Sequence, residues 1–555
     1  MMKRKLSVII AIMFLGCAGN LGAIPGDVIL SFPTPAGCPS GLAWDGQFLW
    51  LADWKEARLY KINPGSGEVV QSIPAPGFRP QGLAWGNGRL YVSDIQTFVN
   101  EYQAGIVYVM DPQTGKVETS YTTPGPSPRD VGFDGRYLLL VDDKEDRIYK
   151  LNPDDGTTIA SFDAPEKNSQ GACFDGKYIW ISDRIRDEIY MVTSDEGIVV
   201  VSLYAPGSYS CGLTWDGRYL WNVDFASDRM YKLEVHNGDT YSVRNFREAT
   251  IEFTQTIRNL GPDPIEKVQV YLAVPEEALK HQELMSDIQY VPNVDNFKTD
   301  RWGQKVAAYV FEDVEPGEVV GARYSVAARI GDLRHYVLPE RVGSLDEIPR
   351  DLKKRYLTEG SRYFINEPVI RETAGQVAGG ETNPYWIARK LFEYEIGKVE
   401  YELAGGWDIA PTILERGTGS CSEYAFLYIA LCRAAGLPAR YQAGVAVRGD
   451  DTCVDNVYHR WVEVYLPNYG WIPVDPSRGD QQTPASRASH FGILSNMLFV
   501  TTRGGGDSEY LGWTYNANTT CVYSGKCDIV KDSYALWQPI TAKGKRNASE
   551  NGECR

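Results

Sequence analysis

Residues 41–46 read Gly-Leu-Ala-Trp-Asp-Gly, and this phrase returns in variant form four more times before residue 235. The five copies begin at Gly41, Gly82, Asp130, Gly171 and Gly212. Their aromatic residues are 41, 48, 41 and 41 positions apart, and short strand-like runs separated by Asp-Gly, Asn-Pro and Pro-Gly turns lie between them. A period of roughly 40 residues with four strands per unit is typical of a β-propeller. The sequence therefore predicts an all-β propeller of five blades over residues 24–235.

The two ends of the repeat region complement each other. The first strand-like run, Ile29–Pro33, matches the run that ends each repeat, whereas the last repeat stops at Leu233 without one. We therefore expect the N-terminal run to complete the fifth blade and close the ring. Closure would bring Cys38 and Cys211 to similar places in adjoining blades, which predicts a disulfide between them. The repeat resembles the NHL and YVTN-like propeller families. Because propellers bind more often than they catalyse, we interpret this half as a recognition or spacing module.

An aspartate lies nine positions after the aromatic residue of every copy. These residues are Asp53, Asp94, Asp142, Asp183 and Asp224. A ring of carboxylates could bind a cation, but aspartate also caps turns by accepting hydrogen bonds from backbone N–H groups. The turn-cap interpretation is favoured, and no metal site is predicted.

The pattern changes after residue 235. Residues 236–345 contain alternating apolar and polar runs such as Thr250–Arg258, with no repeat, which predicts a β-sandwich. Residues 346–505 begin with helical spacing, as in Tyr385–Ile396, and continue with three strand-like runs beyond Pro438. This order predicts an α+β unit.

The last part of the chain, residues 506–555, is expected to form a small β-rich extension and a flexible tail. Cys521 and Cys527 flank a short turn-like loop and are predicted to form a local disulfide. Cys453 could pair with a C-terminal cysteine.

Cys421 lies between small residues at the start of an amphipathic run that ends at Gly-Leu-Pro438. A helix N-terminus lowers the pKa of a thiol, because its unpaired N–H groups and dipole stabilise negative charge. A cysteine nucleophile also needs a base, and the base needs a group to orient it. The chain has five histidines, of which His459 begins a strand-like run, and Asp475 ends the next run. Two adjacent antiparallel strands could therefore bring Asp475 beside His459, with the helix end supplying Cys421.

Four segments together resemble the transglutaminase-like superfamily. They are Gly417–Ala425, Leu431–Arg440, His459–Tyr465 and Gly470–Ser477. The resemblance covers roughly residues 350 to 500 and implies a papain-like fold. It also implies Cys421 as nucleophile, His459 as general base and then acid, and Asp475 as the residue that orients the imidazole. His490 is a weaker candidate for the base, because it lacks the strand and aspartate context.

The N-terminus indicates export. Three basic residues, Lys3-Arg4-Lys5, precede an apolar run and a small-residue stretch that ends near Ala23, which is the layout of a signal peptide over residues 1–23. The protein is therefore predicted to be secreted, periplasmic or on the cell surface. A lipid anchor on Cys17 is the alternative. No later run is apolar over the ~20 residues that a membrane-spanning helix needs.

The net charge of −16, without clusters of Lys and Arg, excludes nucleic acid as an expected partner. The resulting prediction is an exported cysteine-dependent hydrolase or acyltransferase for amide or peptide bonds. It would act through a thioester on a protein or peptide substrate, with cell-wall peptide among the candidates. The reaction demands no cofactor. The alternative is an inactive binding or scaffold protein, in which the propeller and the papain-like core both serve as docking surfaces.

Overall fold

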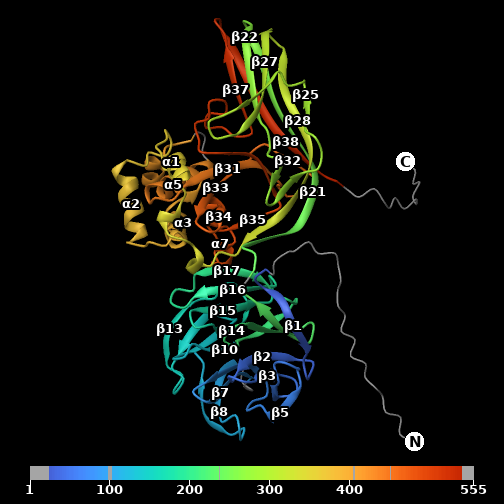
Figure 1. Cartoon of the computed structure of the whole chain (residues 1–555), viewed down its shortest axis with the longest axis vertical. Coiled ribbons are helices and arrows are strands. Elements are labelled where there is room, and N and C mark those ends of the chain that lie inside the picture. The colour runs from blue at the N-terminus through green and yellow to red at the C-terminus, as the bar shows by residue number, and fades with distance from the viewer. Residues whose placement is uncertain (1–23, 98–102, 237, 404–406, 450–451, 541–555) are drawn as a thin grey trace, which may run out of the picture.

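The computed structural model describes residues 24–97, 103–236, 238–403, 407–449 and 452–540. The predicted signal peptide, Cys17 and the cysteine at 554 lie outside these ranges. A propeller forms one end of the molecule, a β-sandwich forms the other, and a helical unit with its own sheet lies at the side between them (Figure 1). This is the multidomain architecture predicted above.

Within residues 24–97 and 103–236 the chain forms five antiparallel four-stranded sheets, one for each repeat. The strands are β1 (Asp27–Pro33), β2 (Pro39–Trp44), β3 (Leu49–Asp53), β4 (Arg58–Ile62), β5 (Val69–Pro74), β6 (Pro80–Gly86), β7 (Arg89–Thr97), β8 (Gln103–Met110), β9 (Val117–Thr122), β10 (Pro128–Phe133), β11 (Leu138–Asp142), β12 (Arg147–Leu151), β13 (Thr158–Asp163), β14 (Ser169–Phe174), β15 (Tyr178–Asp183), β16 (Glu188–Thr193), β17 (Val199–Tyr204), β18 (Ser210–Trp215), β19 (Leu220–Asp224) and β20 (Arg229–Glu234). Strand β1 pairs with β20, so the N-terminal strand closes the ring as expected.

The residue that begins each repeat lies on the propeller axis, where the inner strands of the blades meet. A Cβ atom on Gly41 would lie 2.5 Å from the Cα of Gly82, so only glycine fits at this approach. Asp130 replaces glycine in the third blade, and its carboxylate accepts backbone N–H groups of Leu83 at 3.1 Å and Ala172 at 2.9 Å. Burial raises the pKa of Asp130 well above its ordinary value, despite these hydrogen bonds. One aspartate thus joins the inner strands of three blades.

The repeated aspartates cap turns. In the third blade, Asp142 accepts the N–H of Ser127 at 2.7 Å with one oxygen and those of Lys144 and Glu145 at 3.0 Å with the other. Asp53 and its counterparts in the other blades accept backbone N–H groups in related positions. The carboxylates are therefore directed at the backbone of their own blades, as the turn-cap interpretation predicts. The described residues contain no group of three or more His, Cys, Asp or Glu arranged to hold a metal ion.

The sandwich has two sheets in the described residues. The larger has the order β23-β24-β28-β21-β38-β32, with β25 and β35 also on β28, and the smaller has the order β26-β27-β22-β37. The strands are β21 (Tyr241–Pro262), β22 (Ile265–Ala273), β23 (Ala278–Leu279), β24 (Gln282–Leu284), β25 (Gln289–Val291), β26 (Asn296–Thr299), β27 (Lys305–Val314), β28 (Val319–His335), β32 (Cys453–Asp455), β35 (Ile493–Leu494), β37 (Ala517–Val522) and β38 (Cys527–Pro539). Alternate residues of β21, including Ala249, Ile251 and Phe253, are buried in the core between the sheets.

The C-terminal strands belong to this sandwich. Strand β37 pairs with β22, and β38 pairs with β21 along residues 249–262. The sequence predicted a small β-rich extension and tail over residues 506–555; its strands are part of the two sandwich sheets, with β38 between β21 and β32 and β37 beside β22. Local sequence carries no signal for these pairings, because the paired residues are 245 to 290 positions apart in the chain.

The remaining elements form the α+β core, in which one side of the sheet β34-β33-β31-β36 is packed against helices. They are the 3-10 helices η1 (Pro339–Arg341) and η2 (Leu345–Glu347), the helices α1 (Arg350–Tyr356), α2 (Pro368–Ala378), α3 (Pro384–Lys398), α4 (Ala410–Arg416), α5 (Cys421–Ala434), α6 (Pro476–Gly479) and α7 (Pro484–Ala488), and the strands β29 (Glu400–Tyr401), β30 (Thr418–Gly419), β31 (Ala439–Ala446), β33 (His459–Leu466), β34 (Gly470–Val474) and β36 (Leu498–Gly504). Helix α5 is buried on all sides from Cys421 to Arg433, so it is the central helix of the core.

The core contacts the propeller at the side of the fourth blade, beside β17 (Figure 1). Ala485 and Ala488 of α7 pack against propeller residues that include Phe162. Arg186 binds Glu166 at 3.0 Å and donates to Ser486 of α7 at 2.8 Å. The core therefore lies against the side of the propeller.

The predicted disulfides are absent among the described residues: Cys38, Cys211, Cys453, Cys521 and Cys527 are all free thiols. Cys38 and Cys211 are not equivalent in the repeat, because they lie three residues and one residue before the axial glycine of their blades. Cys521 and Cys527 lie on strands of opposite sheets of the sandwich. Cys453, in β32, lies opposite Trp537 of β38. No helix in the described part of the chain is long and apolar enough to cross a membrane.

Candidate functional site

Helix α5 begins at Cys421. Gly417, with φ of +76°, ends the preceding helix in the left-handed conformation that glycine adopts most readily. The Glu423 carboxylate accepts the N–H of Ser420 at 2.8 Å and binds Arg416 at 2.7 Å, which fixes the start of α5. The Cys421 side chain thus lies in the first turn of the helix, where the N–H groups and the helix dipole favour an anion. The residue is 7% exposed.

Strands β33 and β34 bring a histidine and an aspartate together. They pair antiparallel, with His459 at the start of one and Asp475 directly after the end of the other. The His459 Nε2 atom lies 2.7 Å from Asp475 Oδ2. The other carboxylate oxygen, Oδ1, accepts the Ser477 hydroxyl at 2.9 Å and the Arg478 N–H at 3.2 Å. The carboxylate is therefore held in place, and Nδ1 is the imidazole nitrogen left for Cys421.

The pKa shifts of the three groups all favour the charged form of the side chain. Burial raises the pKa of the Cys421 thiol, but the hydrogen bond and charge of His459, followed by the N–H and charge of Arg460, together lower it below its ordinary value. Burial lowers the pKa of His459, but Asp475 and then Cys421 raise it to about 9. Burial raises the pKa of Asp475, yet His459 and Arg478 together lower it to about 2. The three residues predicted from the sequence lie together.

Arg460 is a buried cation beside this group. It is 0% exposed, and its guanidinium carbon lies 4.5 to 4.9 Å from the centres of four aromatic rings. The rings belong to Trp407, Phe426, Tyr441 and Tyr515. Its Nη2 atom donates to the Trp513 carbonyl at 2.5 Å, whereas Nε and Nη1 have no hydrogen-bond partner among the described residues. No described carboxylate forms an ion pair with it, so its positive charge acts on Cys421.

The sequence alone predicted no role for Arg460 or Tyr515. Strand alternation did place Arg460 on the face of β33 that carries Val462 and Val464, both fully buried, so a buried cation could have been inferred. Tyr515 has no such signal, because it lies far along the chain. Burial and the charge of Cys421 raise the pKa of its phenol, which is also hydrogen-bonded to Ser422.

Two residues have structural or peripheral positions. Arg440 binds Glu463 at 2.7 Å and lies 4.1 Å from the Trp471 ring, so its guanidinium has a structural position. The carbonyl of His490 accepts the N–H of Asp475 at 2.8 Å. His490 therefore lies on the Asp475 side of the site.

Comparisons with known proteins cover the part of the chain that contains this site. The model of the transglutaminase-like superfamily matches residues 371–476, a segment that contains Cys421, His459 and Asp475. An uncharacterized protein of Haemophilus influenzae is 26% identical over 168 residues, which cover 26% of this chain and 44% of that protein. The uncharacterized protein YebA of Bacillus subtilis is 27% identical over 104 residues, 17% of this chain and 14% of that protein. The chain thus spans less than half of each relative.

Among solved structures, a candidate cysteine protease of Cytophaga hutchinsonii is similar with a TM-score of 0.41 and 16% identity, over 55% of this chain and 94% of that one. The chain thus joins a transglutaminase-like domain, matched over residues 371–476, to a β-propeller.

Proposed function

We propose that the protein is an exported cysteine-dependent hydrolase or acyltransferase for amide or peptide bonds, with the propeller as its recognition module. The observation that carries the proposal is the arrangement of Cys421 at a helix N-terminus, His459 beside it and Asp475 at 2.7 Å from the imidazole. A nucleophile, a base and a group that orients the base are the parts that covalent acyl transfer requires.

The reaction would proceed in two halves. The Cys421 thiolate attacks the carbonyl carbon of the amide, and the carbonyl electron pair moves onto oxygen. Collapse of this intermediate breaks the C–N bond, the His459 imidazolium gives its proton to the departing amine, and a thioester remains. Neutral His459 then takes a proton from water or from a second amine as it attacks the thioester. The C–S bond breaks, and the thiolate and imidazolium are restored.

The oxyanion needs hydrogen-bond donors. The N–H of Cys421 has no acceptor among the described residues and lies at the helix N-terminus, so it is the first donor we propose. The hydroxyl of Tyr515, which interacts with the charge of Cys421, is the second. Asp475 would keep the imidazole oriented through both halves of the reaction and would stabilise its charged form whenever it holds the proton.

The first experiment is the pH dependence of Cys421 alkylation by iodoacetamide in the folded protein, with Cys421→Ser as the blank. We expect rapid labelling with a midpoint well below the ~8.5 of a free thiol, and a higher midpoint in His459→Ala. Cys432 is an internal comparison, because it is fully buried and its thiol pKa is raised by that burial. Slow labelling with an ordinary midpoint and no response to His459 would favour an inactive docking protein.

Export is tested separately. If residues 1–23 are a signal peptide, the mature protein from an exporting host begins near Ile24, which intact-mass measurement detects. A mature protein that retains Met1 would contradict export and leave the cysteine chemistry untouched.

A further inference from the structure

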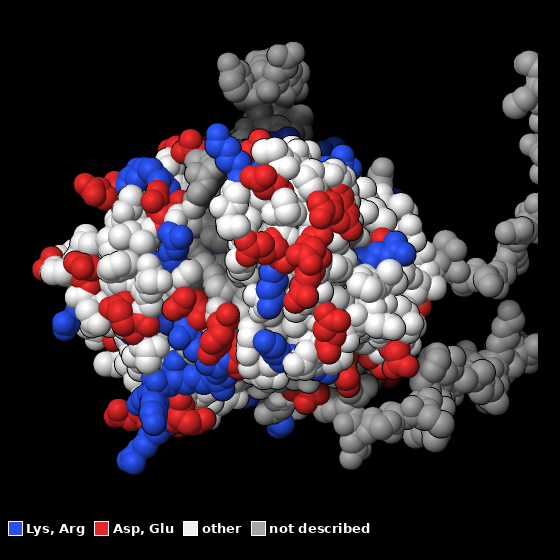
Figure 2. All heavy atoms as spheres, turned by 90° about the horizontal axis from the view of Figure 1, so that it is seen from above, with Lys and Arg blue, Asp and Glu red and all other residues white. Residues whose placement is uncertain are grey.

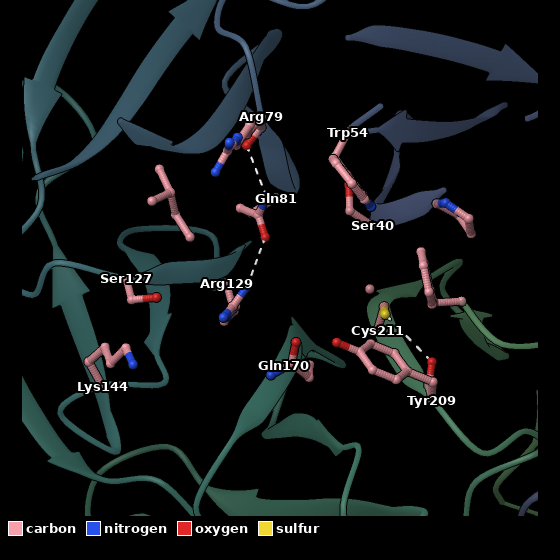
Figure 3. Close-up of a pocket in the computed structure, with 14 residues that line it drawn as sticks. Ser40, Trp54, Arg79, Gln81, Ser127, Arg129, Lys144, Gln170, Tyr209 and Cys211 are labelled. Carbon is pink, nitrogen blue, oxygen red and sulfur yellow. Dashed lines mark hydrogen bonds between the residues drawn. The ribbon is translucent and has the colours of Figure 1, made fainter. Parts of the chain in front are cut away.

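The propeller has a pocket of about 560 Å³ at the end of its axis (Figure 3). Each blade contributes the residue just before its axial glycine or aspartate. These residues are Ser40, Gln81, Arg129, Gln170 and Cys211. The pocket thus lies where the first strand of every blade begins, and its volume suits a small organic ligand.

The pocket positions differ between blades, although the framework around them is repeated. The axial residue is glycine in four copies, and the turn-capping aspartate is present in all five. The residue just before the axial position, in contrast, is Ser, Gln, Arg, Gln or Cys. A residue needed only for the blade fold would be the same in each copy. The variation therefore gives the pocket an asymmetric lining, as a site for one particular ligand would have.

One side of the pocket is cationic. It is lined by Arg79, Arg129 and Lys144 and, among the described lining residues, by no Asp or Glu. Arg129 is held by Asp143 at 2.5 Å and donates to Gln81 at 3.1 Å. The exposed side chains of Arg79 and Lys144 form no ion pair with any described residue.

This cluster contrasts with the charge of the molecule as a whole. The net charge of the chain is −16, and acidic side chains gather over the middle of the face seen in Figure 2. Unpaired cations in a concave site raise the local concentration of anions. The ligand expected here is therefore negatively charged.

The opposite side of the pocket is aromatic. Trp54 and Tyr209 lie across the pocket from Lys144 (Figure 3), and Phe225 also lines it. The rings of Tyr209 and Phe225 are 5.1 Å apart, and Arg184 donates to the Tyr209 hydroxyl at 2.6 Å, which fixes the tyrosine. An apolar or aromatic group of the ligand would pack on this wall.

The backbone at the rim does not supply free donors. The N–H groups of Cys38, Arg79, Ser127 and Tyr209 all donate to the turn-capping aspartates. Arginine and lysine bind carboxylates and phosphates alike, but phosphate sites commonly add a cluster of free backbone N–H groups. This rim lacks such a cluster, so a carboxylate fits it better.

We propose that this pocket binds a small carboxylate that carries an apolar or aromatic group, such as the C-terminal end of a short peptide. Its guanidinium and ammonium groups hold the carboxylate, and Trp54 with its neighbours holds the apolar part. This inference rests on the proposed function only because it names the ligand of the propeller, which is the proposed recognition module. Because binding is measured without turnover, its failure is distinguishable from failure of the chemistry at Cys421.

The test is isothermal titration calorimetry of the full chain carrying Cys421→Ser, with N-acetyl-Ala-Phe as the acid and as its C-terminal amide. We expect the acid to bind at least about tenfold more tightly than the amide, and its affinity to fall as ionic strength rises. Equal affinity for acid and amide would overturn the proposal, and so would inorganic phosphate competing as well as the peptide acid does.

A pair of double variants locates the site. Arg79→Gln with Lys144→Gln is expected to weaken binding of the acid about tenfold or more, because both exposed cations are lost. The matched control, Lys116→Gln with Arg136→Gln, removes the same charge from exposed positions at the other end of the blades and should bind normally. Equal affinities of the two double variants would overturn the assignment.

The aromatic wall is tested by Trp54→Ser. Trp54 is 37% exposed, so the blade should keep its fold, which thermal melting checks. The variant should reduce the preference for the probe ending in Phe over one ending in Ala. An unchanged preference would contradict the orientation proposed for the ligand.

Discussion

At the scale of single residues, the site depends on buried charges that stabilise each other. An isolated buried charge is costly, so Cys421 and His459 can be charged together only because of their surroundings. Asp475 supports the imidazolium, and Arg460 adds a positive charge next to the thiolate. Arg460 itself is solvated by aromatic faces and one carbonyl rather than by a carboxylate, so its charge is not cancelled locally.

Substitution of Arg460 tests this arrangement. Arg460→Met keeps most of the volume inside the aromatic rings and removes the charge, so the pKa of Cys421 should rise and its alkylation near neutral pH should slow. The pH midpoint of iodoacetamide labelling measures the change. Arg460→Ala should also lower the free energy of unfolding, by about 2 to 4 kcal/mol, because it leaves a cavity. An unchanged pH midpoint of labelling in Arg460→Met would show that the charge of Arg460 does not affect the pKa of Cys421.

Two buried histidines predict how stability depends on pH. Burial lowers the pKa of His281 to about 4 and that of His335 to about 3, with smaller contributions from Arg503 and Lys280. The unfolded chain binds protons at these residues below about pH 6.5, whereas the folded chain does not. The contribution of the two neutral histidines to the free energy of unfolding is therefore complete above about pH 6.5 and is lost as the pH falls towards 4.

Chemical unfolding between pH 7 and pH 4.5 checks this prediction. The slope of unfolding free energy against pH should become shallower in His281→Gln with His335→Gln, even if the variant is less stable throughout. His236→Gln is the control, because this residue lies in the segment between the propeller and the sandwich. Equal slopes for the double variant and the unaltered protein would contradict the prediction.

At the scale of elements, the decisive feature is the long strand β21. It spans 22 residues and pairs with β28 on one side and β38 on the other. Without β38, the backbone donors and acceptors of β21 would form an open sheet edge, which is prone to aggregate. Trp537 of β38 is also fully buried in the sandwich core.

Truncation tests the role of β38. A chain that ends before Cys527 should aggregate or unfold at a much lower temperature, because it loses the strand and the buried Trp537. Size-exclusion chromatography and thermal melting measure both effects. A chain that ends after Ile540 keeps every strand pair described here and serves as the control. If the shorter chain is soluble and monomeric with unchanged melting, the prediction is refuted.

At the scale of the whole molecule, the propeller and the rest of the chain are joined by buried polar contacts. Arg334 of β28 pairs with Glu188 of the fourth blade, donates to the Ser202 carbonyl at 3.1 Å and lies 4.1 Å from the Tyr204 ring. This side chain is largely buried, so removal of one partner leaves the other charge without compensation. The contact therefore couples the propeller to the site-bearing half.

The prediction is that Arg334→Ala weakens this coupling by about 3 kcal/mol or more and separates the unfolding of the propeller from that of the rest. Differential scanning calorimetry should then resolve two transitions. Lys177→Ala is the matched control, because its ion pair with Glu340 is exposed and such pairs contribute about 0 to 1 kcal/mol. A single transition at the same temperature in both variants would contradict the prediction.

The amino-acid sequence determined the features that are local or periodic. The repeat of roughly 40 residues predicted five blades and their closure, because the same strand and turn signals recur at a fixed spacing. The motifs around Cys421, His459 and Asp475 could be recognised because each is a short segment; strand pairing then brings His459 beside Asp475, and helix α5 supplies Cys421. The catalytic roles assigned to them stay predictions.

Only the tertiary structure decided the contacts between distant segments. The pairing of β38 with β21, the aromatic surroundings of Arg460 and the contact of Arg334 with Glu188 all join residues far apart in the chain. The expected Cys38–Cys211 and Cys521–Cys527 disulfides do not form for the same reason, because position within a repeat or a loop does not give the direction of a side chain. Such contacts depend on how separate elements pack, and local sequence does not encode that packing.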